Sequence, residues 1–471
     1  MTAQSSMEMS GSSASLILGR KMDSVPFSGY QVLIIFILAL VGFIEGYDLF
    51  MTGSLLVLAK TPLHLTGTDI QWLLLGPALM GAIGGFGFSA VGDRLSRKAM
   101  LLIGVTATTF LTLLIPLVQN AEELIILRSL TGLGAGGVWS AVYPVGAELM
   151  PAQHRRTYGA VYEMALASSF TVLPFVASLL AAKVSAFRLL ALPGGLALLV
   201  VPAIIYLLLP ESPRWHLRRG EAQIAVDIVN RIIKRSGNRV PPLTVAALGD
   251  LREAAARETL PPYWALFAKG QLRWTVVGVV AGTCAGSAAY MTAALLPKAL
   301  TNQGYAVSVS LGITSVIYLT SFFGKAFTGW LMEVIGRRWA IFLVMAGALP
   351  GFCLMLLAHT AGPYAHVLMI AGGLLVGFTV VSAFPATRMY LSEQFPTALR
   401  GRGHIFGESC GKIVAGGLVP FFMAPHTGSP TIFFGTMLLF AAIGAFVPIV
   451  WGKETIGQIE VIAAEPAMQL A

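Results

Sequence analysis

The chain has 471 residues, of which 56% are hydrophobic and only 11% are charged, with a formal net charge of +9 at pH 7. Soluble globular proteins carry about 25% charged residues, so this composition excludes a soluble domain and a disordered chain. The three cysteines have no paired spacing, so neither disulfides nor a metal site is expected. Twelve spanning helices of about 21 residues would use about 250 residues, which matches the apolar content and predicts an all-α membrane protein.

Twelve stretches are long and apolar enough to cross a bilayer. We expect them at about residues 31–56, 72–91, 100–118, 124–145, 157–182 and 189–209, and then at 274–297, 308–331, 339–358, 366–390, 403–423 and 431–451. The predicted organisation is a mobile cytoplasmic tail (1–30), a six-helix bundle (31–209), a cytoplasmic linker loop with short amphipathic helices (210–273), a second six-helix bundle (274–451) and a C-terminal tail (452–471). In the linker, Ala222 to Arg235 is expected to form a helix with Ile224, Ile228 and Ile232 on its apolar face.

Lysine and arginine are distributed unevenly between these spans. If both termini are cytoplasmic, 23 of the 31 basic residues lie in cytoplasmic segments and four lie in outer segments. The positive-inside rule therefore predicts a multi-pass protein of the plasma (inner) membrane with both termini in the cytoplasm. Since topology accounts for the basic balance, no nucleic-acid partner is expected.

Three signatures in the predicted cytoplasmic loops recur after 240 to 245 residues. The pairs are Asp93-Arg94-Leu95-Ser96-Arg97-Lys98 with Glu333-Val334-Ile335-Gly336-Arg337-Arg338, Glu148-x-x-Pro151-x-x-x-Arg155 with Glu393-x-x-Pro396-x-x-x-Arg400, and Pro210-Glu211-Ser212 with Lys453-Glu454-Thr455. The repeat predicts two six-helix halves related along the membrane normal. Transporters with this architecture bind their substrate between the halves, near the middle of the membrane.

Further motifs carry a resemblance to a known family. They are Gly46-Tyr47-Asp48 in the first span, Arg128-x-x-x-Gly132-x-Gly134-x-Gly136-Gly137 in the fourth and Pro210-Glu211-Ser212-Pro213-Arg214-Trp215 after the sixth. Together with the repeated loops, they resemble the major facilitator superfamily, specifically its sugar-porter and aromatic-acid:proton-symporter branches. The resemblance covers nearly all of residues 30–460 and implies the major facilitator fold. Ser89, Ser96 and Val334 depart from the family's usual residues, so a weaker gating network is expected in the loop that carries Val334.

The resemblance implies a latch on the cytoplasmic side. In this family, loop acids bond to a helix N-terminus and to arginines of the opposite bundle, and thereby close the inner side. The alternative is that these basic loops serve only topology. The candidate gating residues are Asp93, Arg94, Arg97, Glu148, Arg155, Glu333, Arg337, Arg338, Glu393 and Arg400.

Eight ionisable residues other than histidine fall within the spans, where a charge is costly and each is therefore a functional candidate. They are Glu45, Asp48, Arg128, Glu163, Lys325, Arg388, Glu408 and Lys412. The resemblance places Asp48 and Arg128 where proton-coupled sugar porters keep a proton-binding acid and its arginine. The alternative for these two is a permanent ion pair. Glu45 shares a helix face with Asp48 and is a substrate-cavity acid, a second proton site or a partner of a cation in the other half.

The remaining charges leave several roles open. Lys412 either pairs with Glu408 one turn before it or attracts an anionic substrate. Lys325 and Arg388 are substrate ligands or extend their long side chains to water. Glu163 has a gating role or forms a salt bridge at the inner end of its span. Polar candidates for the cavity wall, which equally suit simple packing, are Tyr47, Tyr143, Tyr162, Thr283, Ser287, Tyr290 and Tyr318.

The expected substrate is inferred from sequence motifs that are missing from the spans. Sugar porters of the resembling branch carry a Gln-Gln pair in the seventh span, whereas no Gln or Asn occurs between Arg273 and Thr301. The Gly-Pro-x-x-Gly-Gly pattern of drug:proton antiporters is absent from the fifth span. We therefore expect a monomeric, proton-coupled importer of a small organic anion, an aromatic or hydroxy carboxylate, that works by alternating access without a cofactor. Sugar or polyol symport is the alternative. An enzyme is disfavoured because His-Glu-x-x-His and Gly-x-Ser-x-Gly motifs are absent.

Overall fold

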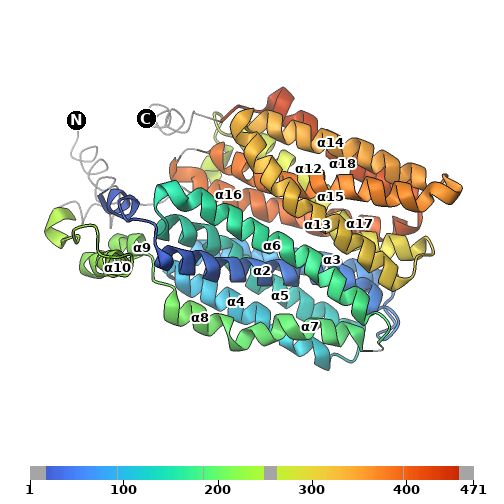
Figure 1. The fold of residues 1–471 in the computed structure, drawn as a ribbon, viewed down its shortest axis with the longest axis horizontal. Coiled ribbons are helices and arrows are strands. Elements are labelled where there is room, and N and C mark those ends of the chain that lie inside the picture. The colour runs from blue at the N-terminus through green and yellow to red at the C-terminus, as the bar shows by residue number, and fades with distance from the viewer. Residues whose placement is uncertain (1–16, 93, 184, 249–261, 396, 456–471) are drawn as a thin grey trace.

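The chain folds into a bundle of long helices that lie roughly side by side (Figure 1). The computed structural model describes residues 17–92, 94–183, 185–248, 262–395 and 397–455. Within these residues, twelve helical stretches are long and apolar enough to span a membrane, and no strand occurs. The prediction of twelve spans is confirmed, and most helices extend a few residues beyond the expected limits. The first, for example, runs over Gly29–Leu58 where 31–56 was expected.

The twelve spans fall into two sets of six. The N-terminal set consists of α2 (Gly29–Leu58), α3 (Gly67–Val91), α4 (Arg97–Leu114), α5 (Ala121–Leu149), α6 (Ala152–Leu180) and a sixth crossing made of α7 (Ala186–Leu196) and α8 (Val201–Leu208). The C-terminal set consists of α12 (Leu272–Asn302), α13 (Val307–Val334), α14 (Arg337–Ala358), α15 (Ala365–Glu393), an eleventh crossing and α18 (Pro430–Trp451). The eleventh crossing is made of α16 (Thr397–Gly411), a π-helical turn (Lys412–Leu418) and α17 (Val419–Met423).

The linker places two short helices, α9 (Pro213–Arg218) and α10 (Ala222–Arg235), at one end of the bundle (Figure 1). We call this end the linker side and the opposite end the far side. The helix expected at Ala222–Arg235 is confirmed with the same bounds. Ile228 and Ile232 are buried as expected, but Ile224 is 46% exposed, because the buried face turns toward Ala225 and Val229 instead.

The N-terminal segment is packed where a mobile tail was expected. Leu18, Met22 and Val25 are buried in the same apolar core as α10 and the N-terminal helices. The Asp23 carboxylate accepts a hydrogen bond from the backbone N–H of Ala152 at 2.7 Å, so it caps the first turn of α6. The expectation of mobility is therefore wrong for residues 17–30, and residues 1–16 lie outside the described chain.

Glycines allow α3 and α5 to pack with their backbones in contact. A Cβ atom at Gly132 would overlap the backbone of Pro77 in α3, and one at Gly136 would overlap the backbone of Gly81. Small residues at such a crossing let van der Waals contacts form along the backbones, which is how helices associate in lipid. The glycine motif that follows Arg128 therefore sets the distance between these two helices.

Replacement of Gly132 by valine is expected to destabilise the N-terminal half by about 1–3 kcal/mol, because the added side chain forces α5 away from α3. The loss is measured as a lower midpoint of thermal unfolding in detergent. Gly159→Val in α6 is the matched control, because a Cβ there meets no atom within 4 Å. Equal midpoints for the two variants would contradict the packing argument.

The two halves meet along three lines of contact. The helix α6 packs along α13, α2 packs against α12, and α3 packs against the eleventh crossing. On the far side, the Gln71 side chain of α3 donates to the backbone carbonyl of Phe421 at 3.1 Å. On the linker side, the ring centroids of Phe86 in α3 and Phe406 in α16 lie 6.4 Å apart. The halves therefore touch on both sides of the middle of the bundle.

Candidate functional site

Asp48 and Arg128 form a buried ion pair within the N-terminal half. Asp48 on α2 and Arg128 on α5 are 6% and 1% exposed, and Arg128 Nη1 lies 2.5 Å from Asp48 Oδ1. Arg128 Nη2 also donates to the Asp48 carbonyl at 2.8 Å and to the Thr52 hydroxyl at 3.1 Å. The Thr112 hydroxyl donates to the same carboxylate oxygen at 3.1 Å. The structure thus brings together the acid and the arginine that the sequence selects for proton coupling.

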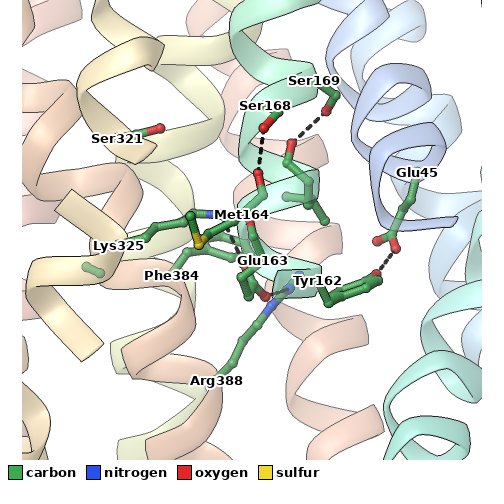
Figure 2. A network of polar contacts seen from close by, with 12 residues as sticks. Glu45, Tyr162, Glu163, Met164, Ser168, Ser169, Ser321, Lys325, Phe384 and Arg388 are labelled. Carbon is green, nitrogen blue, oxygen red and sulfur yellow. Dashed lines mark hydrogen bonds and ion pairs between the residues drawn. The ribbon is translucent and has the colours of Figure 1, made fainter. Parts of the chain in front are cut away.

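Glu45 lies one turn before Asp48 and accepts a hydrogen bond from the Tyr162 hydroxyl of α6. Figure 2 shows these two side chains directed toward each other. Glu45 and Asp48 line the same cavity, as their spacing predicts. Glu45 is therefore held by a neutral donor, whereas Asp48 is held by a cation.

Glu163 connects the two halves. One carboxylate oxygen lies 2.9 Å from Lys325 Nζ of α13, and the other lies 3.1 Å from Arg388 Nη1 of α15. The Tyr143 hydroxyl of α5 donates to the second oxygen at 2.5 Å. Figure 2 shows Lys325 and Arg388 approaching Glu163 from the C-terminal helices. Lys325 and Arg388 are buried and paired, so the idea that they extend to water is wrong.

The cluster continues within the C-terminal half. Arg388 Nε donates to Glu408 at 2.9 Å, and the other oxygen of Glu408 lies 3.6 Å from Lys412 Nζ. The Lys412 ammonium also lies over the ring of Trp139 in α5, 2.8 Å from its centroid. Within the described residues, Lys412 Nζ has no hydrogen-bond partner although an ammonium carries three donors. Lys412 therefore lies beside Glu408, as one alternative expects, and its role toward an anionic substrate stays a prediction.

Three small cavities surround this cluster, and Lys412 lines each of them. The largest has a volume of about 60 Å³ and lies between Asp48, Arg128, Trp139, Tyr290 and Lys412. A water needs about 10–15 Å³ of such space, so this cavity has room for several waters and is too small for an aromatic acid. In this structure, the three cavities around the cluster therefore leave no room for such a substrate.

Of four aromatic and hydroxyl candidates for the cavity wall, two line a cavity and two do not. Tyr143 lines the cavity beside His404, and Tyr290 lines the other two. Tyr47 does not, because its hydroxyl donates to the Leu190 carbonyl of α7 at 2.7 Å inside the N-terminal half. Ser287 is fully buried and donates to the Thr283 carbonyl of its own helix. For these two residues, the expectation of a cavity position is wrong.

Sequence reasoning missed Trp139 and His404, which both line the cavity beside Glu45 and Glu408. Trp139 follows the glycine motif of α5 by two residues. A large ring beside a run of small residues was the sequence feature that could have identified it as a cavity residue. His404 is in α16, where the flanking Gly401 and Gly403 gave no indication of a polar site.

On the linker side, the repeated motifs bond mainly within their own halves. Arg337 at the start of α14 pairs with Glu393 at the end of α15, with 3.2 Å between Nε and the carboxylate. The Glu454 carboxylate accepts from the backbone N–H groups of Arg337 and Arg338, the first turn of α14. An acid at a helix N-terminus is favourable, as the resemblance implies. These contacts connect the charged loop residues of the C-terminal half to one another.

The loop motifs of the N-terminal half are connected by a similar set of contacts. The Ser212 hydroxyl donates to Glu148, so the motif after the sixth span contacts the motif after the fourth. Ser96 caps α4 by accepting from the Ala99 N–H and donates to Glu211 at 3.0 Å. Arg155 pairs with Asp23 of the N-terminal segment at 3.1 Å.

The other gating candidates lie at or near helix ends on the linker side. Arg94 and Glu333 are exposed, and Arg97 and Arg400 are half-buried. Asp93 lies outside the described residues. The latch was expected to reach arginines of the opposite bundle, but Arg155 pairs with Asp23 of the N-terminal segment and Arg337 pairs with Glu393 of its own half. The gating role of this set stays a prediction.

Comparisons with known proteins agree with this architecture. Residues 38–420 match the family model of the Major Facilitator Superfamily. The chain is 25% identical over 460 residues to the inner membrane metabolite transport protein YdjE of Escherichia coli (93% of this chain, 96% of the relative). It is 24% identical over 443 residues to the gallate transporter of Pseudomonas putida (91% and 93%).

Among solved structures, the proton:xylose symporter XylE has the same fold, with a TM-score of 0.70 and 18% sequence identity, and the match covers 93% of this chain and all of that chain. The family match extends over most of the spans, and every relative named here is a transporter. The chain is therefore a member of the major facilitator superfamily, a twelve-helix transporter and not an enzyme.

Proposed function

We propose that this transporter imports a small organic anion, an aromatic or hydroxy carboxylate, together with protons across the inner membrane. The observation that carries the proposal is the Lys412 ammonium, which is buried, faces all three cavities and lacks a hydrogen-bond partner among the described residues. A buried cation with unused donors is suited to a carboxylate. The likeness to a gallate transporter supports the same class of substrate.

The Asp48–Arg128 pair supports proton coupling. An acid held by an arginine gives up its proton, and the same acid takes one up when the arginine withdraws in a nonpolar surrounding. Asp48 lines the cavity that Lys412 also lines, so the two sites share one space. This shared space supports a coupling between protonation of Asp48 and the rearrangement that moves the substrate.

Uptake into proteoliposomes tests the proposal. The purified protein is given gallate and benzoate as carboxylates and xylose as a sugar, with and without an inward proton gradient. We expect one or both carboxylates to accumulate only with the gradient. Accumulation of xylose with no carboxylate uptake would overturn the substrate class.

Proton-coupled sugar transport is the second candidate. The fold shared with a proton:xylose symporter favours it, and the Asp48–Arg128 pair would serve it equally well. The lining of the three cavities argues against it, because it includes no Asn or Gln among the described residues. Amide side chains are donors and acceptors at once and suit sugar hydroxyls.

Replacement of Lys412 by methionine is expected to raise the half-saturation concentration for the transported carboxylate by about tenfold or more, since a hydrogen bond to a charged group contributes about 1.5–3 kcal/mol. Initial uptake rates over a concentration series measure the change. Lys60→Met is the control, because Lys60 is exposed on the far side. An unchanged half-saturation concentration would leave Lys412 as a structural partner of Glu408.

A further inference from the structure

Glu163 has an unusual place among the buried charges. The Asp48–Arg128 pair lies within the N-terminal half, and the pairs of Glu408 lie within the C-terminal half. Two ion pairs between described, buried side chains cross from one half to the other, and both end on Glu163. A single carboxylate of the N-terminal half thus holds two cations of the C-terminal half.

The contacts of Glu163 are those that a bound carboxylate ligand would make. One oxygen takes the Lys325 ammonium, and the other takes the Arg388 guanidinium and the Tyr143 hydroxyl. The side chain of Glu163 is 10% exposed and those of Lys325 and Arg388 are 4% and 11% exposed. Arg388 and Tyr143 also line the cavity that contains Lys412. Arg388 therefore connects the bridge to the wall of the proposed binding site.

Two buried cations require an anion nearby, because an uncompensated charge in a nonpolar interior is strongly unfavourable. We propose that Glu163 is an internal stand-in for the substrate: its carboxylate occupies Lys325 and Arg388 in the empty transporter, and the carboxylate of the substrate takes them over. The proposal rests on the proposed function, since only an anionic substrate can make this replacement. It assigns Lys325 and Arg388 to the substrate carboxylate.

The replacement has two consequences. A neutral ligand cannot release Glu163, so the site selects carboxylates over amides of the same shape. The empty transporter must also change sides after each net import, and the Glu163 bridge keeps a counter-charge beside the two cations during this step, with Glu408 as a second anion beside Arg388. Exchange of substrate for substrate does not require the empty transporter to change sides, so it does not need the bridge.

Equilibrium binding tests the competition. Benzoate and benzamide, which share a ring but differ in charge, are titrated into the purified full-length protein by calorimetry. Glu163→Gln keeps the shape and removes the competing charge, so we expect benzoate to bind about tenfold tighter than to the wild type, with benzamide unchanged. Glu122→Gln removes the same charge from an exposed position at the start of α5 and should change neither affinity.

Glu163→Asp covers the case in which Glu163→Gln does not fold. It keeps the charge but is too short to reach both cations, so benzoate should bind about threefold tighter. Weaker or unchanged benzoate binding in the folded variants would overturn the stand-in role.

Transport in proteoliposomes gives the second readout. For Glu163→Gln, net benzoate uptake should fall by about tenfold or more while exchange against internal benzoate stays within about threefold of the wild type. Equal loss of both modes would overturn the proposal and leave Glu163 a structural bridge. If the wild type binds neither benzoate nor gallate but binds xylose, the proposed function fails. If the wild type binds benzoate and the variants bind it no more tightly, only the stand-in role fails.

Discussion

Replacement of Asp48 by asparagine is expected to abolish accumulation driven by a proton gradient while substrate exchange continues. Asparagine can accept from Arg128 and Thr112 as Asp48 does, but it cannot bind and release a proton. A gradient of one pH unit corresponds to about 1.4 kcal/mol, so the wild type should reach about tenfold accumulation for each coupled proton. The variant should stop at equal concentrations inside and outside.

The measurement is the ratio of internal to external labelled gallate in proteoliposomes at steady state, with an inward gradient of one pH unit, after subtraction of the ratio reached in liposomes without protein. Asp227→Asn is the control, because Asp227 is exposed on α10 and lines none of the three cavities. Uphill accumulation by the Asp48 variant would show that another group carries the proton. Glu45, which lines the same cavity, would then be the next candidate.

Replacement of Arg388 by methionine is expected to reduce both stability and carboxylate uptake severely. Arg388 lies between Glu163 and Glu408, so its removal leaves two buried carboxylates with one cation fewer. Removing one partner of a buried pair costs about 3–5 kcal/mol, which should lower the unfolding midpoint in detergent. Carboxylate uptake should fall to the level of empty liposomes.

The double variant Arg388→Met with Glu408→Gln separates the two effects. Removal of the orphaned carboxylate should restore much of the unfolding midpoint, because a neutral pair in place of an ion pair is often close to neutral in stability. Uptake should stay lost, since the guanidinium that meets the substrate is still missing. Recovery of uptake in the double variant would contradict a binding role for Arg388.

The sequence was sufficient for the architecture because each span is determined locally. A run such as Leu189 to Leu209 has no charged side chain, so its transfer into the membrane needs no partner. The pairing of Asp48 with Arg128 was also accessible, through the resemblance of their motifs to those of the family. The approximate helix bounds therefore followed from local composition, and this one contact followed from the resemblance.

The positions of the other site residues depend on how each helix is rotated in the bundle. Tyr47 neighbours Asp48 in sequence, yet a step of one residue along a helix turns it by about 100°, toward α7 and away from the cavity. Lys325 and Arg388 looked able to reach water, but a carboxylate on α6, far away in sequence, holds both. Contacts of this kind come from packing between halves, which a single sequence does not reveal without structure.

The docked N-terminal segment has a consequence for how the protein is made. Asp23 caps α6, and Leu18 and Met22 pack in one core with α10, so this segment cannot settle until both later helices exist. Chains emerge from the ribosome N-terminus first, and units fold as they become complete. The first six spans, α10 and the N-terminal segment can therefore fold together during translation, before the seventh span is made. The second half then inserts beside an N-terminal half that is already folded.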